Sequence, residues 1–241
     1  MADGDGRYLF NMLETLLALP DVDSMDTVAL TNAVQRRMPL YDKSQEGHYN
    51  LISALHKSLR GSDTDGALYW FSRMIAGGED PHYIARRLLR FSVEDVGLAD
   101  PQALVQAMNA WQAYERLGTP EGELALVQCI IYLATAPKSN AAYLAEKVSR
   151  KVASDTGSLM PPQHILNAST KMMKELGYGE NYAYDHDAEE GFSGQNYFPD
   201  GMSRQTFYYP KKRGFEREIQ KRLDYWNKLR DKKSKSNESK S

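Results

Sequence analysis

Residues 77–101 read GGEDPHYIARRLLRFSVEDVGLADP, and this stretch decides the fold because it carries repeated helix start signals around an apolar repeat. Asp80 and Asp100 each precede a proline. A side-chain oxygen at the N-cap, followed by proline at the first helical position, is a strong helix start signal. Between them, apolar residues recur at spacings of four and three, at Ile84, Leu88 and Phe91. That spacing places them on one helical face, so the stretch predicts an amphipathic helix.

Further helix start and stop signals lie on both sides of this stretch. Further start signals are Ser62-Asp63, Thr119-Pro120 and Ser139. Glycines stand where the helices are expected to stop, at positions 61, 77, 97, 118, 157 and 177. The predicted connections are two to five residues long, which favours antiparallel packing of consecutive helices. No strand-like alternation of any length occurs, so we predict an all-α fold, a compact array of antiparallel helices.

The two ends of the chain differ from this array. Residues 4–18 are predicted to be helical, residues 36–42 form a loop, and a helix over about 44–59 leads into the array. Residues 179–210 are a long irregular segment rich in aromatic side chains, which we expect to pack down. A final amphipathic helix is predicted over about 214–230. Residues 231–241 contain almost no apolar side chains and are expected to form a disordered basic tail.

Composition indicates a cytoplasmic protein whose C-terminal end is basic. The chain has 241 residues, a formal net charge of −2 and a single cysteine, Cys129, which lies in an apolar run and is expected in the core. No apolar run is long enough to span a bilayer. From Arg204 to the end there are 13 Lys and Arg against 5 Asp and Glu. Such an asymmetry is typical either of a nucleic-acid contact or of a solvated tail.

Motifs for nucleotide hydrolysis or metal binding are missing from this sequence. It contains no phosphate-binding loop with the Gly-x-x-x-x-Gly-Lys-Ser/Thr spacing and no apolar strand that ends in paired acids. Asp185-His186-Asp187 stands in a polar loop without a second histidine-rich segment, so we expect no metal there. We therefore predict no catalytic residues, no metal and no cofactor for this chain alone.

Two groups of basic residues are candidates for contact with nucleic acid. Arg86 and Arg90 lie one helical turn apart. They form either a phosphate-binding face or a ladder of ion pairs with Glu94 and Asp95 that fixes helix packing. Lys211, Lys212 and Arg213 follow three aromatic residues, a combination that suits single-stranded nucleic acid. A packed aromatic hairpin with a solvated basic turn explains the second group equally well.

Several ordered strings resemble the replication-associated recombination protein A family, whose eukaryotic relative is the Werner-helicase-interacting ATPase. They are EGHYN at 46–50, ALHKSLRGSD at 54–63, ALYW at 67–70, GGEDP at 77–81, ARRL at 85–88, EDVGLADP at 94–101, APKS at 136–139 and LGYG at 176–179. The similarity covers essentially residues 1–230, and the number of strings in the expected order makes it specific.

The resemblance implies clamp-loader-related AAA+ ATPases that act in DNA replication and repair, with ATP and Mg²⁺ bound by an ATPase core. It implies that residues 1–42 are the remnant of the helical lid and that 43–178 form an oligomerisation domain, as a homotetramer. Residues 3–7 (DGDGR) are similar to the family's sensor-2 segment, so the resemblance makes Arg7 the nucleotide-sensing arginine. The implied partners are DNA, at replication forks or single-stranded, and single-strand-binding protein.

Two functions remain open on the sequence. The chain is either the lid remnant and oligomerisation or DNA-association portion of such an ATPase, without the ATPase core, or a stand-alone helical adaptor for nucleic acid or a replication protein. An in-frame phosphate-binding loop encoded upstream of Met1 would distinguish them.

Overall fold

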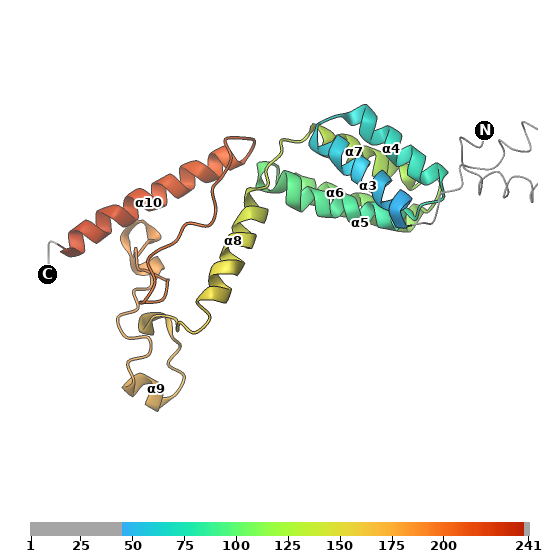
Figure 1. Ribbon diagram of the computed structural model, residues 1–241. Helices are drawn as coiled ribbons and strands as arrows, with labels where there is room; N and C mark the ends of the chain where they lie inside the picture. The colour runs from blue at the N-terminus through green and yellow to red at the C-terminus, as the bar shows by residue number, and fades with distance from the viewer. Residues whose placement is uncertain (1–44, 239–241) are drawn as a thin grey trace, which may run out of the picture.

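A computed structural model describes residues 45–238, and in this range all regular secondary structure is helical, with no strand (Figure 1). Five helices form a bundle: α3 (Gln45–Arg60), α4 (Thr64–Ala76), α5 (Pro81–Phe91), α6 (Gln102–Leu117) and α7 (Glu123–Thr135). Helices α8 (Ala141–Asp155), α9 (Lys171–Glu175) and α10 (Glu216–Glu238) lie outside it. The predicted all-α class is confirmed. The predictions for residues 1–44, including Arg7, lie outside the described residues.

The bundle forms because each helix buries one apolar face against α7. Helix α7 contacts α3, α4, α5 and α6, which makes it the central helix. The predicted repeat on α5 lies in the core, since Ile84, Leu88 and Phe91 are at most 1% exposed. Burying each such side chain stabilises the fold by about 1.5–3 kcal/mol. The other fully buried large side chains of the bundle are Leu55, Leu59, Met74, Leu126, Ile130 and Leu133.

The predicted caps are mostly confirmed, with one error. The Asp63 and Asp80 carboxylates accept hydrogen bonds from the backbone N–H groups of Gly66 and His82, each at 2.9 Å. Asp100 does the same for Gln102 at 3.1 Å. The start predicted at Thr119-Pro120 is wrong, because α7 begins at Glu123 after a turn and Gly122 takes the cap position.

Antiparallel packing of consecutive helices stops after α7. The connection through residues 136–140 does not turn back, and α8 leads away from the bundle (Figure 1). Helix α8 contacts the π-helical turn η1 (Ser92–Val96) and the 3₁₀ turn η2 (Gly97–Ala99), and Ala141 is its only buried residue. Other apolar side chains of α8, among them Leu144 and Val148, are left exposed.

Residues 156–210, which we call the wing, follow α8. The wing contains α9 and the 3₁₀ turns η3 (Gln163–Ile165), η4 (Asp185–Asp187) and η5 (Glu189–Gly191). Polar contacts hold the wing together. The Asp185 carboxylate accepts from the Ser193 N–H, the Ser193 hydroxyl and the Tyr197 hydroxyl at 2.7–2.8 Å. Several of its aromatic side chains stay half exposed, among them Tyr182 and Tyr184, so they pack less completely than predicted.

The chain before α10 returns to the bundle, and from there α10 runs across the wing and away from the bundle (Figure 1). Its Trp226 ring lies 5.2 Å from the Phe192 ring of the wing. It continues past the predicted end at Arg230 to Glu238, so residues 231–238 are helical where a disordered tail was expected. Its basic residues continue a helix that the apolar face has already nucleated. Among residues 45–238, no helix is both long and apolar enough to cross a membrane.

Candidate nucleic-acid interface

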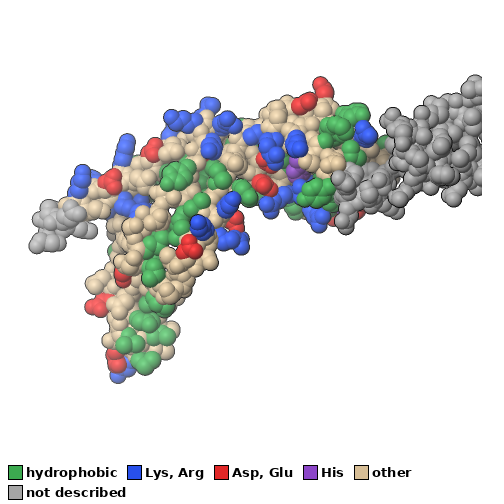
Figure 2. Space-filling model, viewed as in Figure 1, with side chains coloured by type: hydrophobic (Ala, Val, Ile, Leu, Met, Phe, Trp, Pro, Cys, Tyr) green, Lys and Arg blue, Asp and Glu red, His purple; other side chains and the backbone are tan. Residues whose placement is uncertain are grey.

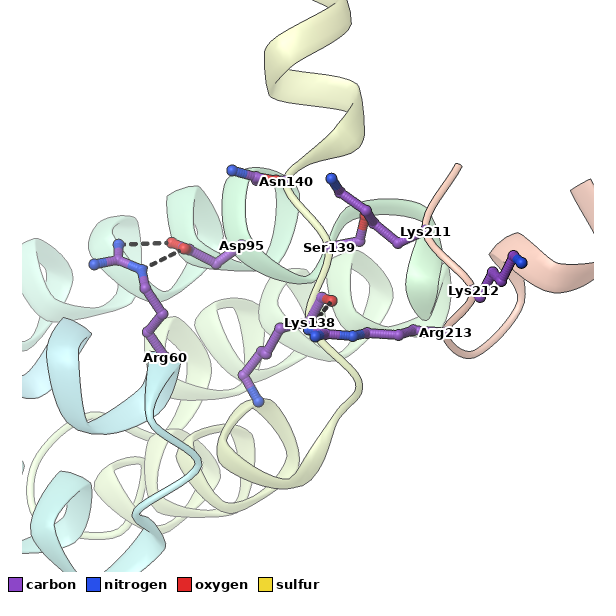
Figure 3. Close-up of a pocket in the computed structure, with 8 residues that line it drawn as sticks. All are labelled: Arg60, Asp95, Lys138, Ser139, Asn140, Lys211, Lys212 and Arg213. Atoms are coloured by element: carbon purple, nitrogen blue, oxygen red, sulfur yellow. Dashed lines mark hydrogen bonds and ion pairs between the residues drawn. The ribbon is translucent and has the colours of Figure 1, made fainter. Parts of the chain in front are cut away.

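The predicted basic turn Lys211–Arg213 lines a cavity of about 490 Å³, which we call the basic notch (Figure 3). Four segments meet there: the end of α3, the π-helical turn η1, the α7–α8 connection and the turn before α10. The complete lining is Arg60, Asp95, Lys138, Ser139, Asn140, Lys211, Lys212 and Arg213. The notch therefore gathers five cationic side chains and one carboxylate.

The basic turn is held from inside by a buried carboxylate. Glu216 is fully buried, and its two oxygens accept hydrogen bonds from the Lys211 N–H at 2.7 Å and from the Tyr208 hydroxyl at 2.8 Å. Burial, together with this hydrogen bond, raises the pKa of Tyr208, so its hydroxyl remains a donor. The first residue of the turn is thus fixed through its backbone, which leaves its side chain available for other contacts.

The turn also docks directly on the bundle. The Phe215 N–H donates to the Ala99 carbonyl oxygen at 2.8 Å. Gly214, with φ +49°, makes this contact possible, because a Cβ there would lie 2.0 Å from the same oxygen. The backbone of the turn is therefore docked on the bundle, while the side chains of Lys211, Lys212 and Arg213 are exposed, as both interpretations of the sequence expect.

The single carboxylate of the notch is already neutralised. Arg60 Nε donates to Asp95 Oδ1 at 2.6 Å and its NH2 group donates to Oδ2 at 3.1 Å, a bidentate ion pair. The hydrogen bond to Asp95 raises the pKa of Arg60. Asp95 thus joins η1 to the end of α3, and its charge does not repel an incoming anion.

The Lys138 ammonium binds backbone oxygens of the fold and does not face the interior of the notch. Its ammonium group donates to the carbonyl oxygens of Ala134 at 2.9 Å and Ala136 at 2.6 Å, and to the Ser62 hydroxyl at 3.3 Å. It caps the C-terminal end of α7, where a cation is favoured. Burial lowers the pKa of Lys138. In Figure 3 its ammonium points away from Lys211 and Lys212.

The donors that remain for a ligand come from the basic turn and from α8. Among residues 45–238, no hydrogen bond or ion pair occupies the ammonium groups of Lys211 and Lys212. Arg213 makes one long hydrogen bond, 3.4 Å, to the Lys138 carbonyl. Asn140 lies at the N-terminal end of α8, where the helix dipole favours negative charge. The notch thus presents several hydrogen-bond donors and positive charges without an unpaired carboxylate.

The other predicted basic group lies elsewhere. Arg90 Nε pairs with Glu94 Oε2 at 2.6 Å, and the Arg86 guanidinium lies 5.4 Å from the centre of the Tyr83 ring. Neither arginine lines the basic notch. The Arg90–Glu94 pair favours the helix-ladder interpretation of this group, although the predicted partner Asp95 pairs with Arg60 instead.

Sequence reasoning missed Arg60, Glu216 and the docking glycine Gly214. Arg60 and Lys138 fall within the family-like strings at 54–63 and 136–139, so those strings were the available signal. Glu216 carries no local signal, since an acid beside basic residues is usually solvated. The wing offers no metal site: no group of three or more potential metal ligands occurs among the described residues.

A helical bundle extended by a wing, with a basic notch where the bundle meets the turn before α10, defines the class: a helical accessory domain. The chain belongs to the MgsA AAA+ ATPase C-terminal family, whose model matches residues 61–227. A second family model, described as an AAA C-terminal domain, matches residues 1–60. The predicted family is confirmed.

The similar proteins carry the expected name. The chain is 44% identical over 248 residues to replication-associated recombination protein A of Coxiella burnetii, covering 99% of this chain and 56% of that protein. It is 43% identical over 229 residues to the protein of the same name from Escherichia coli, covering 92% and 51%. ATPase WRNIP1 of Dictyostelium discoideum is 36% identical over 229 residues, covering 86% and 26%. The chain spans about half the length of the bacterial relatives.

Proposed function

We propose that this chain is the oligomerisation and DNA-association portion of a replication and recombination AAA+ ATPase, and that the basic notch is where it holds a DNA phosphate. The names of its relatives support a place in replication and recombination. The lining of one cavity by Lys211, Lys212 and Arg213 supports the binding of a phosphate. Lysine supplies point charge and little base information, so these contacts act on the phosphates rather than on sequence.

The geometry favours a bound phosphate over a diffuse surface attraction. The turn is fixed by Glu216 and by the Ala99 contact, so its side chains lose less conformational freedom on binding than those of a loose tail. The bidentate Arg60–Asp95 pair removes the only carboxylate as a competitor. Both features raise the affinity of the notch for an anion.

Single-stranded DNA is the form that the surroundings favour. Tyr209, two residues before the turn, is 67% exposed. An exposed aromatic ring beside backbone-neutralising charges suits unpaired bases, because every base presents a face for stacking. We therefore expect weak, sequence-tolerant and salt-dependent binding of single strands.

The test is a salt series with fluorescein-labelled oligothymidylate, read by anisotropy, on the chain and on a K211A/K212A/R213A variant. Each phosphate contact contributes about −0.7 to the log–log salt slope on single strands, so the variant should flatten the slope by about 2. A matched variant, K151A/K171A/K174A, removes three exposed lysines elsewhere and should leave the slope unchanged. Equal slopes in the chain and the notch variant, with circular dichroism intact, would reject the proposal.

We further propose that the chain associates into homotetramers. Helix α6 leaves Leu104, Val105 and Met108 39–45% exposed, and α8 leaves Leu144 and Val148 41–48% exposed. Apolar patches of this kind are typical of protein interfaces. Light scattering should report four copies, and L104E/M108E should dissociate them. M172E, a change of an exposed methionine on α9, should not. A monomer at tens of micromolar would reject this assembly.

A further inference from the structure

We propose that the outer face of α10 is a second binding surface for single-stranded DNA, which continues from the basic notch. We call it the basic track and define it as Arg217, Lys221, Lys228, Lys232 and Lys235. The proposal rests on the proposed function, because the track begins where the notch ends. It adds residues and length to the path that the strand would follow.

Helical geometry places these residues in one row. At 100° per residue they fall within an arc of about 60°, and from Arg217 to Lys235 the row runs about 27 Å along the helix. All of them are exposed. Figure 2 shows Lys and Arg side chains along the outer edge of α10.

The opposite face of α10 has its own contacts with the wing. The Arg230 guanidinium lies 5.2 Å from the centre of the Phe192 ring, and the Lys233 ammonium donates to the Phe192 carbonyl. Trp226 packs on the same phenyl ring. These cations serve packing, and the contacts fix the rotation of the helix. As a result, the basic track faces solvent.

The charge of this region is strongly positive. Residues 211–235 contain eleven Lys and Arg against four Asp and Glu. Of the four acids, Glu216 is buried beneath the basic turn and Glu218 pairs with Lys221 at 2.8 Å. Asp224, which accepts from the Gln220 side chain, and Asp231 lie about 20° and 40° from Arg217, along the edge of the track opposite Lys232. The five cations of the track outnumber these two carboxylates, and such a net positive row attracts a polyanion.

Tyr225 indicates that the ligand is single-stranded rather than duplex. It lies about 80° around the helix from Arg217, along the edge of the track, and is 49% exposed. Its ring meets Trp226 edge-on, with centroids 5.0 Å apart, which holds it in place and leaves a face for a base. A duplex, whose bases are stacked inside, gains nothing from such a ring.

The experiment compares full-length chains by anisotropy with fluorescein-labelled oligothymidylate and with a labelled duplex. K221Q/K228Q should flatten the salt slope by about 1.4, since each phosphate contact contributes about 0.7. K171Q/K174Q, a change of equal charge on α9, should not alter it. Glutamine keeps the helix, because its helical propensity is close to that of lysine.

The stacking role is tested separately with Y225A. It should weaken binding of the single strand at least about fivefold while leaving the salt slope unchanged, because stacking is uncharged. If K221Q/K228Q and Y225A bind like the unaltered chain while K211A/K212A/R213A does not, the basic track is rejected and the notch stands. If both groups of variants lose duplex binding as strongly as single-strand binding, the single-strand assignment is wrong.

Discussion

The bundle and the wing are held together by different forces. In the bundle, large side chains such as Phe91 and Leu133 are completely buried. In the wing, among the residues whose exposure is described, only Pro162 is buried, and hydrogen bonds around Asp185 set the shape. Apolar burial is cooperative and costly to disturb, whereas exposed polar contacts each contribute little. The turn at Gly214 lies where the apolar bundle meets the polar part of the chain.

The place where the two regions meet is where a ligand could contact both. The basic notch lies where the bundle and α10 meet, so an anion there contacts both Asn140 of the α8 end and Lys211 of the basic turn. If the proposed anion binds there, it should add a further link between α8 and the basic turn. The following predictions test this contrast in stability.

The largest difference is expected from truncating one side chain in each region. L133A in the bundle should lower the free energy of unfolding by about 2–5 kcal/mol, because a fully buried leucine leaves a cavity. M160A in the wing, where the side chain is 69% exposed, should change it by less than about 0.5 kcal/mol. Urea unfolding followed by circular dichroism measures both, and comparable losses would contradict the contrast.

Acid should destabilise the bundle through His56. Burial, with a smaller contribution from the nearby Arg87 charge, lowers the pKa of His56 to about 4. The unfolded chain takes up this proton near pH 6.5 and the native chain only near 4, so stability falls as pH drops through that window, by up to about 3 kcal/mol.

H56Q should remove this dependence on pH. Urea midpoints measured between pH 7 and 4 should converge for the two proteins as pH falls. Asp185 of the wing does not contribute in this window, because hydrogen bonds from Ser193 lower its pKa further below its ordinary value. A midpoint for H56Q that falls as steeply as that of the unaltered chain would assign the acid sensitivity to other groups.

The junction can be tested with a pair of glycines. Gly214 and Gly78 both have positive φ, +49° and +82°, but only at Gly214 would a Cβ meet another atom within 4 Å. G78A should cost about 1–2 kcal/mol from the backbone alone. G214A should in addition break the Phe215–Ala99 hydrogen bond, seen as lost amide-exchange protection of Phe215 and faster tryptic cleavage at 211–213. Unchanged cleavage in G214A would show that the wing docks by other contacts.

The smallest effect separates two lysines of the basic notch. K138M should cost about 1 kcal/mol, because the α7 carbonyls lose the ammonium that caps them. K212M should stay within about 0.5 kcal/mol, since that ammonium makes no hydrogen bond or ion pair among residues 45–238. K212M should weaken the binding of oligothymidylate more than K138M does. Equal stability losses would mean that both lysines support the fold.

The sequence by itself determined what local chemistry decides. The caps at Asp63 and Asp80 and the repeat of Ile84, Leu88 and Phe91 depend on residues three or four apart, and the structure confirms them. The strings that resemble the family could be recognised for the same reason, because each is a run of neighbouring residues. The basic turn Lys211–Arg213 was visible for the same reason, as a charge run beside aromatics.

Only the tertiary structure decided how these pieces meet. The docking of Gly214 on Ala99, the Arg60–Asp95 pair and the bond from Lys138 to Ser62 depend on contacts between residues far apart in the chain. Arg60 and Lys211 share a cavity although about 150 positions separate them. Such contacts arise from where whole helices pack, and that depends on shape and buried area summed over the molecule rather than on a local spacing.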